Sequence, residues 1–365
     1  MPLSRRKTLA LIGGGTILAA GGWAGHVATR SPDKALAPWR VAGGYDEPRR
    51  FALSYAILAP NPHNRQPWLA ELVGDDTVII HRDRTLNLPE TDPYDRQLTI
   101  GMGCFLEGLD IAASARGFKL DTTLFPEGED GPTARVVFQP GAERSPLFDH
   151  MLDRRSCKEP FEDRAVPEEL AFGLQAMADI VTDPDTVAAL RDLTWRAWKV
   201  EAGTPRTHRE SVELMRLGKS EIEANPDGID LGGGMLELLI TFGMLSRQAQ
   251  LDPTSTSYQQ GIAIYQEMLA ATPAYAVVTT NGNTREHQIG AGRQWMRLNL
   301  ATTGLGLSLH PVSQALQEYP EMSEHRQSAH DLLAEPGHTV QMIGRLGFGP
   351  AKPPAPRWPL ENKIL

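Results

Sequence analysis

Residues 59–68, APNPHNRQPW, form a segment well suited to hold a flat polar ring. Pro60 and Pro62 prevent a preceding helix from continuing, so the backbone is extended and offers its N–H and C=O groups outward. The segment also carries amide side chains that donate and accept hydrogen bonds without net charge: Asn61, Asn64 and Gln66. Such a loop suits the edge of a heteroaromatic ring. The alternative interpretation is an Asx-type turn between a helix and a strand, with Trp68 in the core.

Residues 153–161, DRRSCKEPF, form a second segment with chemical potential. Three cations and a hydroxyl fall within five positions: Arg154, Arg155, Ser156 and Lys158. This combination suits a phosphate group, because guanidinium and ammonium groups make charge-assisted hydrogen bonds to its oxygens. The alternative is a solvated basic patch at the end of a helix.

Other catalytic signatures are absent from the sequence. There is no G-x-S-x-G motif, and the ten histidines show no metal-ligand spacing such as H-E-x-x-H. A hydrolase is therefore a weak alternative, and we predict no metal site. Cys104 and Cys157 are too few for a disulfide framework; one disulfide is possible, but two free buried thiols is the interpretation we favour.

The composition is that of a globular protein. The chain has 365 residues, of which 41% are hydrophobic and 22% are charged. Its 45 acidic residues outnumber 36 basic ones, which gives a net charge of −9. We therefore expect no nucleic acid partner, because binding to a phosphate backbone needs an excess of clustered Lys and Arg.

Helix-period and strand-like segments alternate along the chain. The patterns predict a helix over 51–58, a hairpin around Gly74, a helix over about 94–116 and strands over 119–125 and 134–139. The following part is richer in helix, with segments near 167–177, 185–200, 206–224, 235–249 and 258–270. A strand over 274–280, a helix over 284–303 and a strand over 338–347 come next, before a proline-rich tail.

An internal similarity relates the two long helices. Residues 96–118 match residues 285–307 at seven of 23 positions, at a constant offset of 189 residues. Both copies contain Ile-Gly-x-Gly, and paired glycines on a helix permit close approach of another backbone. The similarity has two interpretations: chance likeness of two Gly/Ala-bearing helices, or two diverged copies of one α+β unit.

Residues 1–32 have the layout of a secretory leader. Arg5, Arg6 and Lys7 precede an apolar stretch over residues 9–28. The start resembles a twin-arginine signal, with Thr8 where Phe is usual. We expect export by the twin-arginine machinery to a periplasmic or other extracytoplasmic location. The alternatives are an ordinary secretion signal and an uncleaved leader that tethers the protein, since about 20 residues can span a bilayer.

Residues 59–68 closely resemble the flavin-contacting loop of the nitroreductase family, usually written APSxxNxQPW; we call them the ring loop. The matching positions are Pro60, Asn64, Gln66, Pro67 and Trp68, and Asn61 replaces the usual Ser. Residues 154–158, which we call the phosphate segment, resemble the family's phosphate-binding RRSxR/K motif at each of its specified positions.

Two segments near the C-terminus extend the resemblance. Residues 295–313 are similar to the family's QNLxLAAxxLGLG helix and the loop after it, in which Leu309, His310 and Pro311 would lie against the flavin ring. The resemblance implies a positioned loop residue at His310, with a catalytic acid/base as the alternative. In the basic tail, Arg357 would be a second phosphate ligand.

The resemblance implies an α+β, nitroreductase-like fold that corresponds to a family homodimer fused into one chain. The first half would span residues 38–145 with the ring loop, and the second residues 146–365 with the phosphate segment. One FMN would lie between the halves, and the other site would have been lost. The exported Acg branch is the most similar, which implies a lid over about residues 205–260, with a plain packing helix as the alternative.

The function implied is that of an FMN-dependent oxidoreductase that passes electrons through flavin N5 to a nitro compound, quinone or similar small acceptor. No side chain need be catalytic, because the flavin supplies the chemistry. Arg65 is a candidate cation beside the flavin ring. The electron donor would be NAD(P)H, a quinol or a partner protein. The alternative function is storage or sequestration of FMN under a lid, with little NAD(P)H-dependent activity.

Overall fold

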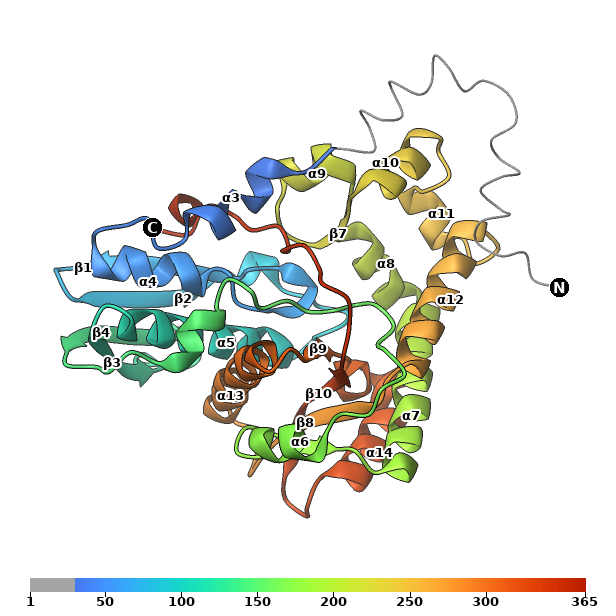
Figure 1. Ribbon diagram of the computed structural model, residues 1–365. Coiled ribbons are helices and arrows are strands. Elements are labelled where there is room, and N and C mark those ends of the chain that lie inside the picture. Colours follow the sequence, from blue (N-terminus) through green and yellow to red (C-terminus); the bar gives the residue numbers. More distant parts are fainter. Residues whose placement is uncertain (1–29) are drawn as a thin grey trace.

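The first half of the chain is built around a four-stranded antiparallel sheet. The computed structural model describes residues 30–365 (Figure 1). Its first elements are α3 (Asp33–Val41), α4 (Pro48–Ala56), β1 (Trp68–Val73), β2 (Thr77–Arg82), α5 (Arg96–Ser114), β3 (Phe118–Leu124) and β4 (Ala134–Pro140). The strands pair in the order β1-β2-β4-β3.

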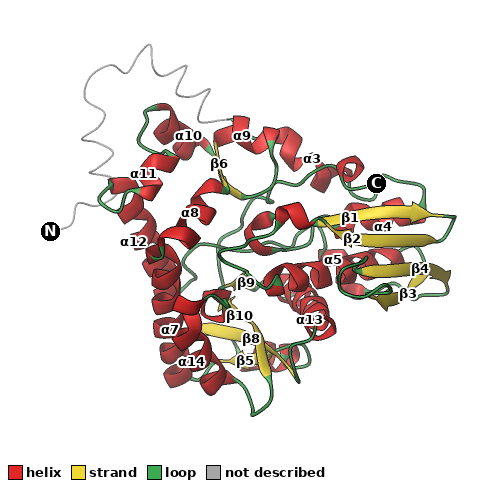
Figure 2. Ribbon diagram, turned by 180° about the vertical axis from the view of Figure 1, so that it is seen from behind, coloured by secondary structure: helices red, strands yellow, loops and turns green. Residues whose placement is uncertain are grey.

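The second half is built around a sheet of the same size. Its elements are α6 (Glu168–Leu174), β5 (Asp179–Val181), α7 (Pro184–Gly203), β8 (Ala274–Thr280), α13 (Arg285–Gly304), β9 (Ser308–Pro311), α14 (Ser323–Leu333) and β10 (Thr339–Gly347). The strands pair in the order β5-β8-β10-β9, and all are antiparallel. Figure 2 shows the two sheets as separate yellow layers.

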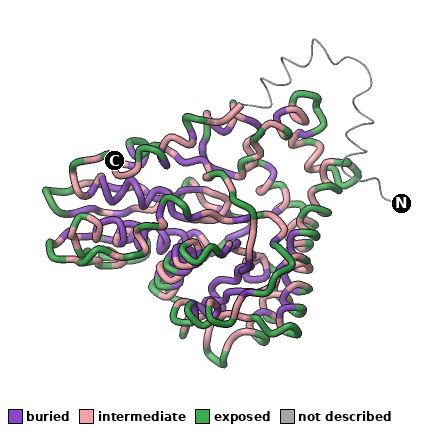
Figure 3. Tube along the Cα trace, viewed as in Figure 1, coloured by how far each residue is buried: buried purple, intermediate pink, exposed green. Residues whose placement is uncertain are grey.

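The two halves share one topology, which confirms the duplication. In each half, the long helix follows the strand that is second in the sheet order and precedes the strand at the far edge of the sheet. Helix α5 thus connects β2 to β3, and α13 connects β8 to β9. The two helices pack against each other at the centre of the molecule, where the chain is mostly buried (Figure 3). The chain therefore folds as two diverged α+β units.

An insert separates α7 from β8. It contains α8 (Pro205–Glu213), β6 (Met215–Leu217), α9 (Gly218–Ala224), β7 (Ile229–Leu231), α10 (Gly234–Thr241), α11 (Arg247–Leu251) and α12 (Thr256–Ala270). The helix predicted over 206–224 is wrong as one element, because the chain leaves α8 and pairs β6 in parallel with β7. Gly218 has a φ of 75°, a left-handed conformation that lets the chain turn sharply from β6 into α9. The helix predicted over 235–249 is likewise divided, into α10 and α11.

The C-terminal tail returns from the second half to the first. The indole N–H of Trp39 donates to the carbonyl of Ala355 over 2.8 Å, and the N–H of Arg357 donates to the carbonyl of Ala35 over 2.9 Å. The last residue, Leu365, donates its N–H to the carbonyl of Ala70 in β1 over 2.9 Å. In Figure 1 the red tail runs from β10 to α3. The tail thereby places a basic residue of the second half beside the ring loop of the first.

Three features of the described chain can be compared with the sequence predictions: the position of Trp68, the state of the two cysteines and the capacity of the helices to span a membrane. Trp68 is fully buried and stacks on Phe105 with a centroid separation of 5.0 Å, so it belongs to the core. Cys104 and Cys157 are both free and buried, as we favoured. No helix within residues 30–365 has the length and apolarity to span a bilayer. The predicted leader lies almost entirely outside the described residues.

Candidate functional site

The ring loop has a strained backbone. Three of its non-glycine residues have left-handed φ values: His63 at 45°, Asn64 at 53° and Gln66 at 51°. Such conformations cost energy and cluster at binding and catalytic sites. The loop lies on α5 at Gly101, where an added Cβ would be 3.0 Å from the Cβ of Asn61. A strained segment that is packed on a central helix is therefore fixed in position.

Asn61 closes the ring loop on itself. Its Oδ1 accepts the N–H of Gln66 over 2.7 Å, and its Nδ2 donates to the carbonyl of Ala59 over 3.1 Å. The Asx-type interpretation of the segment therefore describes this residue well. Pro60 leads into the loop and, like Asn61, is half-buried.

The other two amides of the ring loop bond to distant parts of the chain. Gln66 is fully buried: its Nε2 donates to the carbonyl of Pro226 over 2.7 Å, and its Oε1 accepts the N–H of Trp358 over 3.0 Å. Asn64 donates from Nδ2 to the carbonyl of Pro356 over 3.0 Å, and its Oδ1 accepts a hydrogen bond from Arg357. Gln66 therefore joins the ring loop to the insert and the tail, and Asn64 joins it to the tail.

Three arginines converge at the start of the ring loop. The guanidinium carbons of Arg154, Arg155 and Arg357 lie 5.9, 4.6 and 5.7 Å from the ring centroid of Trp39. The Nη2 atoms of Arg154 and Arg357 both donate to the carbonyl of Leu58, over 3.0 and 3.1 Å. Residues from both ends of the second half thus meet at one carbonyl of the first. We call Arg154, Arg155 and Arg357 the arginine cluster.

No carboxylate within residues 30–365 forms an ion pair with the arginine cluster, although the charge of Asp230 in β7 acts on Arg357 and that of Asp153 acts on Arg155. None of the three Nε atoms has a hydrogen-bond partner there. Burial, together with the charge of Arg155, lowers the pKa of Arg154 to about 10. Burial and the charge of Arg154 lower the pKa of Arg357 to about 9. Buried like charges with free donors favour a bound anion.

The phosphate segment lies alongside β9. Ser156 pairs with Leu309 as an isolated parallel bridge, and the N–H of Cys157 donates to the carbonyl of Leu309 over 3.3 Å. Lys158 is exposed, and its charge lowers the pKa of both His63 and His310. Lys158 therefore lies near the ring loop and β9, and it does not contribute to the shifted pKa values of the arginine cluster.

Two histidines near Lys158 are neutral at pH 7. His310 is buried, and its Nδ1 lies 3.2 Å from Nη1 of Arg345. Burial, then Arg345 and Lys158, hold the pKa of His310 well below its ordinary value, which favours a positioned residue over an acid/base. Burial, followed by Lys158 and Arg65, lowers the pKa of His63 to about 4. Sequence reasoning did not single out His63, because neither its residue type nor its spacing reveals its strained φ.

Arg65 is not a free cation. Its Nη1 lies 2.7 Å from a carboxylate oxygen of Asp227 in the insert, and Nη2 of Arg216 lies 2.7 Å from the other oxygen. All three side chains are largely buried, and the single carboxylate bridges both guanidinium groups, which leaves the trio with one net positive charge. That Arg65 supplies a cation to a ring stays a prediction, and its guanidinium group is held by the insert. Asp227 was missed because it lies in the insert, 162 positions away from Arg65.

The second half lacks the counterpart of the ring loop. Gly101 of α5 is covered by Asn61 and Pro62, whereas Gly290 occupies the equivalent position of α13, is exposed and has no atom within 4 Å of an added Cβ. The chain instead passes from α6 to β5 through a few residues. Only one copy of the ring-loop site is therefore present in the described part of the chain.

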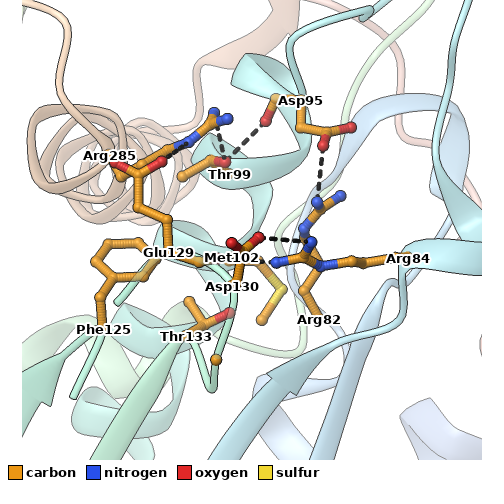
Figure 4. A pocket seen from close by; sticks show the side chains of 11 residues that line it. Arg82, Arg84, Asp95, Thr99, Met102, Phe125, Glu129, Asp130, Thr133 and Arg285 are labelled. Carbon is orange, nitrogen blue, oxygen red and sulfur yellow. Dashed lines mark hydrogen bonds and ion pairs between the residues drawn. The ribbon is translucent and has the colours of Figure 1, made fainter. Parts of the chain in front are cut away.

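Two pockets of the described chain lie away from the ring loop. A pocket of about 110 Å³ contains three ion pairs, Arg82–Asp95, Arg84–Asp130 and Arg285–Glu129, whose side chains point toward one another (Figure 4). Its cations are already paired, so they offer no free charge to a phosphate. An apolar groove of about 360 Å³ lies between His150, Leu170 and Gly304. Within residues 30–365 no cluster of His, Cys, Asp or Glu could hold a metal ion.

Comparison with known proteins gives relatives along most of the chain. No family model matches the sequence. An uncharacterized protein of Mycobacterium tuberculosis, Rv3127, is 33% identical over 86% of this chain and 91% of its own length. The probable NAD(P)H nitroreductase PigM of a Serratia strain is 24% identical over 75% of this chain and 82% of its own. The putative NAD(P)H nitroreductase acg of Mycobacterium tuberculosis is 31% identical over 31% of this chain and 36% of its own.

Solved structures were matched as well. The FMN-dependent nitroreductase NfnB of Mycobacterium smegmatis, in complex with NADPH, matches 59% of this chain and 96% of its own with a TM-score of 0.36 and 17% identity. A nitroreductase of Bacteroides fragilis with bound FMN matches 57% of this chain and 90% of its own, with a TM-score of 0.32 and 13% identity.

Proposed function

Because this chain belongs to the nitroreductase family, we propose that it binds one FMN between its two halves and works as an oxidoreductase. The observation that carries the FMN proposal is the arginine cluster, in which three guanidinium groups meet with unused Nε donors and without an ion pair to a carboxylate among residues 30–365. The phosphate of FMN would bind there, and its ring would lie toward the ring loop and β9.

The residues present fit a phosphate. The free Nε donors of Arg154, Arg155 and Arg357 would meet its oxygens, and Ser156 lies in the same segment. A dianion would also relieve the repulsion between buried cations that lowers the pKa of Arg357. The fit therefore rests on unused donors and on buried cations that form no ion pair among the described residues.

The residues near Lys158 would orient the ring. The strained ring loop supplies backbone groups, Lys158 supplies a cation without an ion pair among the described residues, and His63 supplies a neutral imidazole. Bound FMN would supply hydride transfer at N5, toward a nitro compound, a quinone or a similar acceptor. The chain's own side chains bind and orient, and none of them is assigned a catalytic role.

The insert supports a second candidate, a protein that holds FMN and reacts little with NAD(P)H. Pro226, Asp227 and Gly228 all bond to the ring loop: to Gln66 over 2.7 Å, to Arg65 over 2.7 Å and to the carbonyl of Asn64 over 3.3 Å. The proposed lid, about residues 205–260, would then restrict access of a nicotinamide to the flavin. Such a lid is what the resemblance to the Acg branch implies.

Export bears on the choice of donor. The basic and apolar layout of residues 1–32 supports export by the twin-arginine route. An extracytoplasmic compartment has no supply of NAD(P)H, so a quinol or a partner protein would be the electron donor there.

The test is a visible absorbance spectrum of the purified chain, recorded before and after FMN is added. We expect a flavin band, and its absence after reconstitution would refute the FMN proposal. Rapid anaerobic bleaching with NADPH would identify a nicotinamide-dependent reductase. Bleaching only with dithionite or a quinol would favour a dedicated donor or the holding function.

A double variant, Arg154→Ala with Arg155→Ala, tests the position of the phosphate site. Each lost charge-assisted bond weakens binding by about 1.5–3 kcal/mol, so FMN should be released during purification. Arg84→Ala is the matched control, since Arg84 lies in the small ion-paired pocket and should retain the band. Full retention by the double variant would show that the phosphate binds elsewhere.

A further inference from the structure

Helix α10 and the turn after it expose apolar side chains at the outer end of the insert. The exposed fraction is 57% for Met235, 66% for Phe242 and 48% for Met244. Both views of the fold place α10 away from the two sheets (Figures 1 and 2). We call Met235, Phe242 and Met244 the apolar cap. Large apolar side chains that gather on a surface mark an interaction site more often than scattered single ones do.

The outward face of α10 carries no charge. Glu237 is the one charged residue in positions 234–246, and it points inward. Its carboxylate accepts the N–H of Lys219 and lies 3.9 Å from the guanidinium group of Arg30. Positions 234–246 therefore supply no cation to attract an anionic headgroup, a nucleic acid or an acidic protein, and the contacts of the apolar cap itself must come from apolar burial.

The chain enters the described structure beside α10. Arg30, the first described residue, is the partner of Glu237. Immediately before it in the sequence, residues 9–28 contain no Asp, Glu, Lys or Arg. The most apolar stretch of the leader is thus joined to the fold next to the apolar cap.

We propose that the apolar cap rests in the surface of the lipid bilayer that holds the apolar N-terminal stretch. Met235, Phe242 and Met244 would lie in the interface without crossing the bilayer. Because the outward face lacks Lys and Arg, neutral lipids are sufficient for this contact. The proposal does not depend on FMN or on the proposed reaction.

The test uses the full-length chain in vesicles of phosphatidylcholine, with a polarity-sensitive fluorophore on a single introduced cysteine. Met244→Cys reports from the apolar cap. Phe172→Cys is the matched control, because Phe172 of α6 is 73% exposed and lies outside the insert. The wild-type chain, treated in the same way, measures labelling of Cys104 and Cys157, which are buried.

The expected result is a blue shift of emission and a loss of intensity with brominated lipid at position 244, but neither at position 172. The double substitution Met235→Ser with Phe242→Ser in the labelled Met244→Cys chain should remove both signals. No change at position 244, or equal changes at both positions, would overturn the proposal. A shift at position 244 that requires no vesicles and grows with protein concentration would assign the cap to a second copy of the chain instead.

Discussion

Gly103 of α5 and Gly292 of α13 face each other at the contact between the two halves. A Cβ on Gly103 would lie 2.9 Å from the Cα of Gly292, and a Cβ on Gly292 would lie 2.8 Å from the Cα of Gly103. The two residues are related by the repeat offset of 189 positions. Their reciprocal contact shows that the internal repeat is also a pseudo-symmetric interface.

Alanine at either position should destabilise the fold. An added Cβ would lie 2.2 Å from the carbonyl oxygen of Ile289 in Gly103→Ala, and 2.0 Å from that of Ile100 in Gly292→Ala. Backbone atoms cannot move aside without separating the helices, so we expect each variant to lose about 1–3 kcal/mol or more of unfolding free energy. Urea denaturation measures the loss.

Gly290→Ala is the control on the same helix. No atom lies within 4 Å of its added Cβ, and alanine has the higher helix propensity, so this variant should gain up to about 1 kcal/mol. If Gly290→Ala and Gly292→Ala changed stability equally, helix propensity rather than close approach would explain the glycines.

The sequence predicted the repeat, the core position of Trp68 and the boundaries of the long helices, because these depend on local periodicity. It also predicted that Arg154, Arg155 and Arg357 act together, and the structure brings their guanidinium groups around Trp39. Trp39 itself was missed, since nothing in its neighbourhood distinguishes it from any other apolar helical residue.

The insert was the hardest part to predict. Its strands β6 and β7 are three residues each, too short for an alternating pattern to identify. The parallel pairing of these strands depends on positive φ values at Gly218 and Gly228. The ion pair of Arg65 could not be predicted because its partner Asp227 is distant in sequence, and long-range charge pairing leaves no local signal.

Arg154→Met should stabilise the chain that holds no FMN and should weaken its binding of FMN. In the empty chain it removes a buried charge that is repelled by Arg155, while Arg357 still donates to the carbonyl of Leu58. We expect a gain of about 1 kcal/mol without FMN. With FMN, the variant should lose a charge-assisted bond and bind about tenfold or more weakly.

Thermal unfolding with and without FMN, together with fluorescence titration of FMN, measures both effects. Arg84→Met is the comparison, since Arg84 is partly exposed and paired with Asp130. A loss of stability in the empty Arg154→Met chain would indicate that the cluster is compensated by a contact other than an added anion.

Glu201 should make stability depend on pH. Burial raises the pKa of this carboxyl to about 7, although Gln317 donates to it over 2.8 Å. The folded state therefore holds a proton that the unfolded state releases near its ordinary pKa. The stabilisation is complete below about pH 4.3 and is lost as pH rises to about 7.

Glu201→Gln tests this, since a neutral amide can still accept from Gln317. Above pH 7 the variant should exceed the wild type in stability by on the order of 1–3 kcal/mol, and the difference should shrink toward pH 4. Glu335→Gln, at an exposed position, should follow the wild-type curve. Parallel curves for Glu201→Gln and the wild type would mean that Glu201 has the same pKa in the folded and the unfolded states.

Asp227→Asn should release the insert from the ring loop. The substitution leaves Arg65 and Arg216 without their shared carboxylate in a largely buried site. Removing one partner of a buried ion pair lowers the free energy of unfolding by about 3–5 kcal/mol. Because this contact joins two segments, part of the loss should appear as local unfolding of the insert. We expect faster proteolysis near residues 225–232 and, if the insert is a lid, faster bleaching of bound flavin by NADPH.

The matched control is Asp192→Asn, which removes the exposed partner of Arg196 on α7. An exposed pair contributes about 0–1 kcal/mol, so proteolysis and bleaching should both stay at wild-type rates. The two readouts separate two roles of the insert. Faster proteolysis with unchanged bleaching would mean that Asp227 holds the insert in place but that the insert does not restrict access of NADPH to the flavin. The reductase would then be the better-supported function.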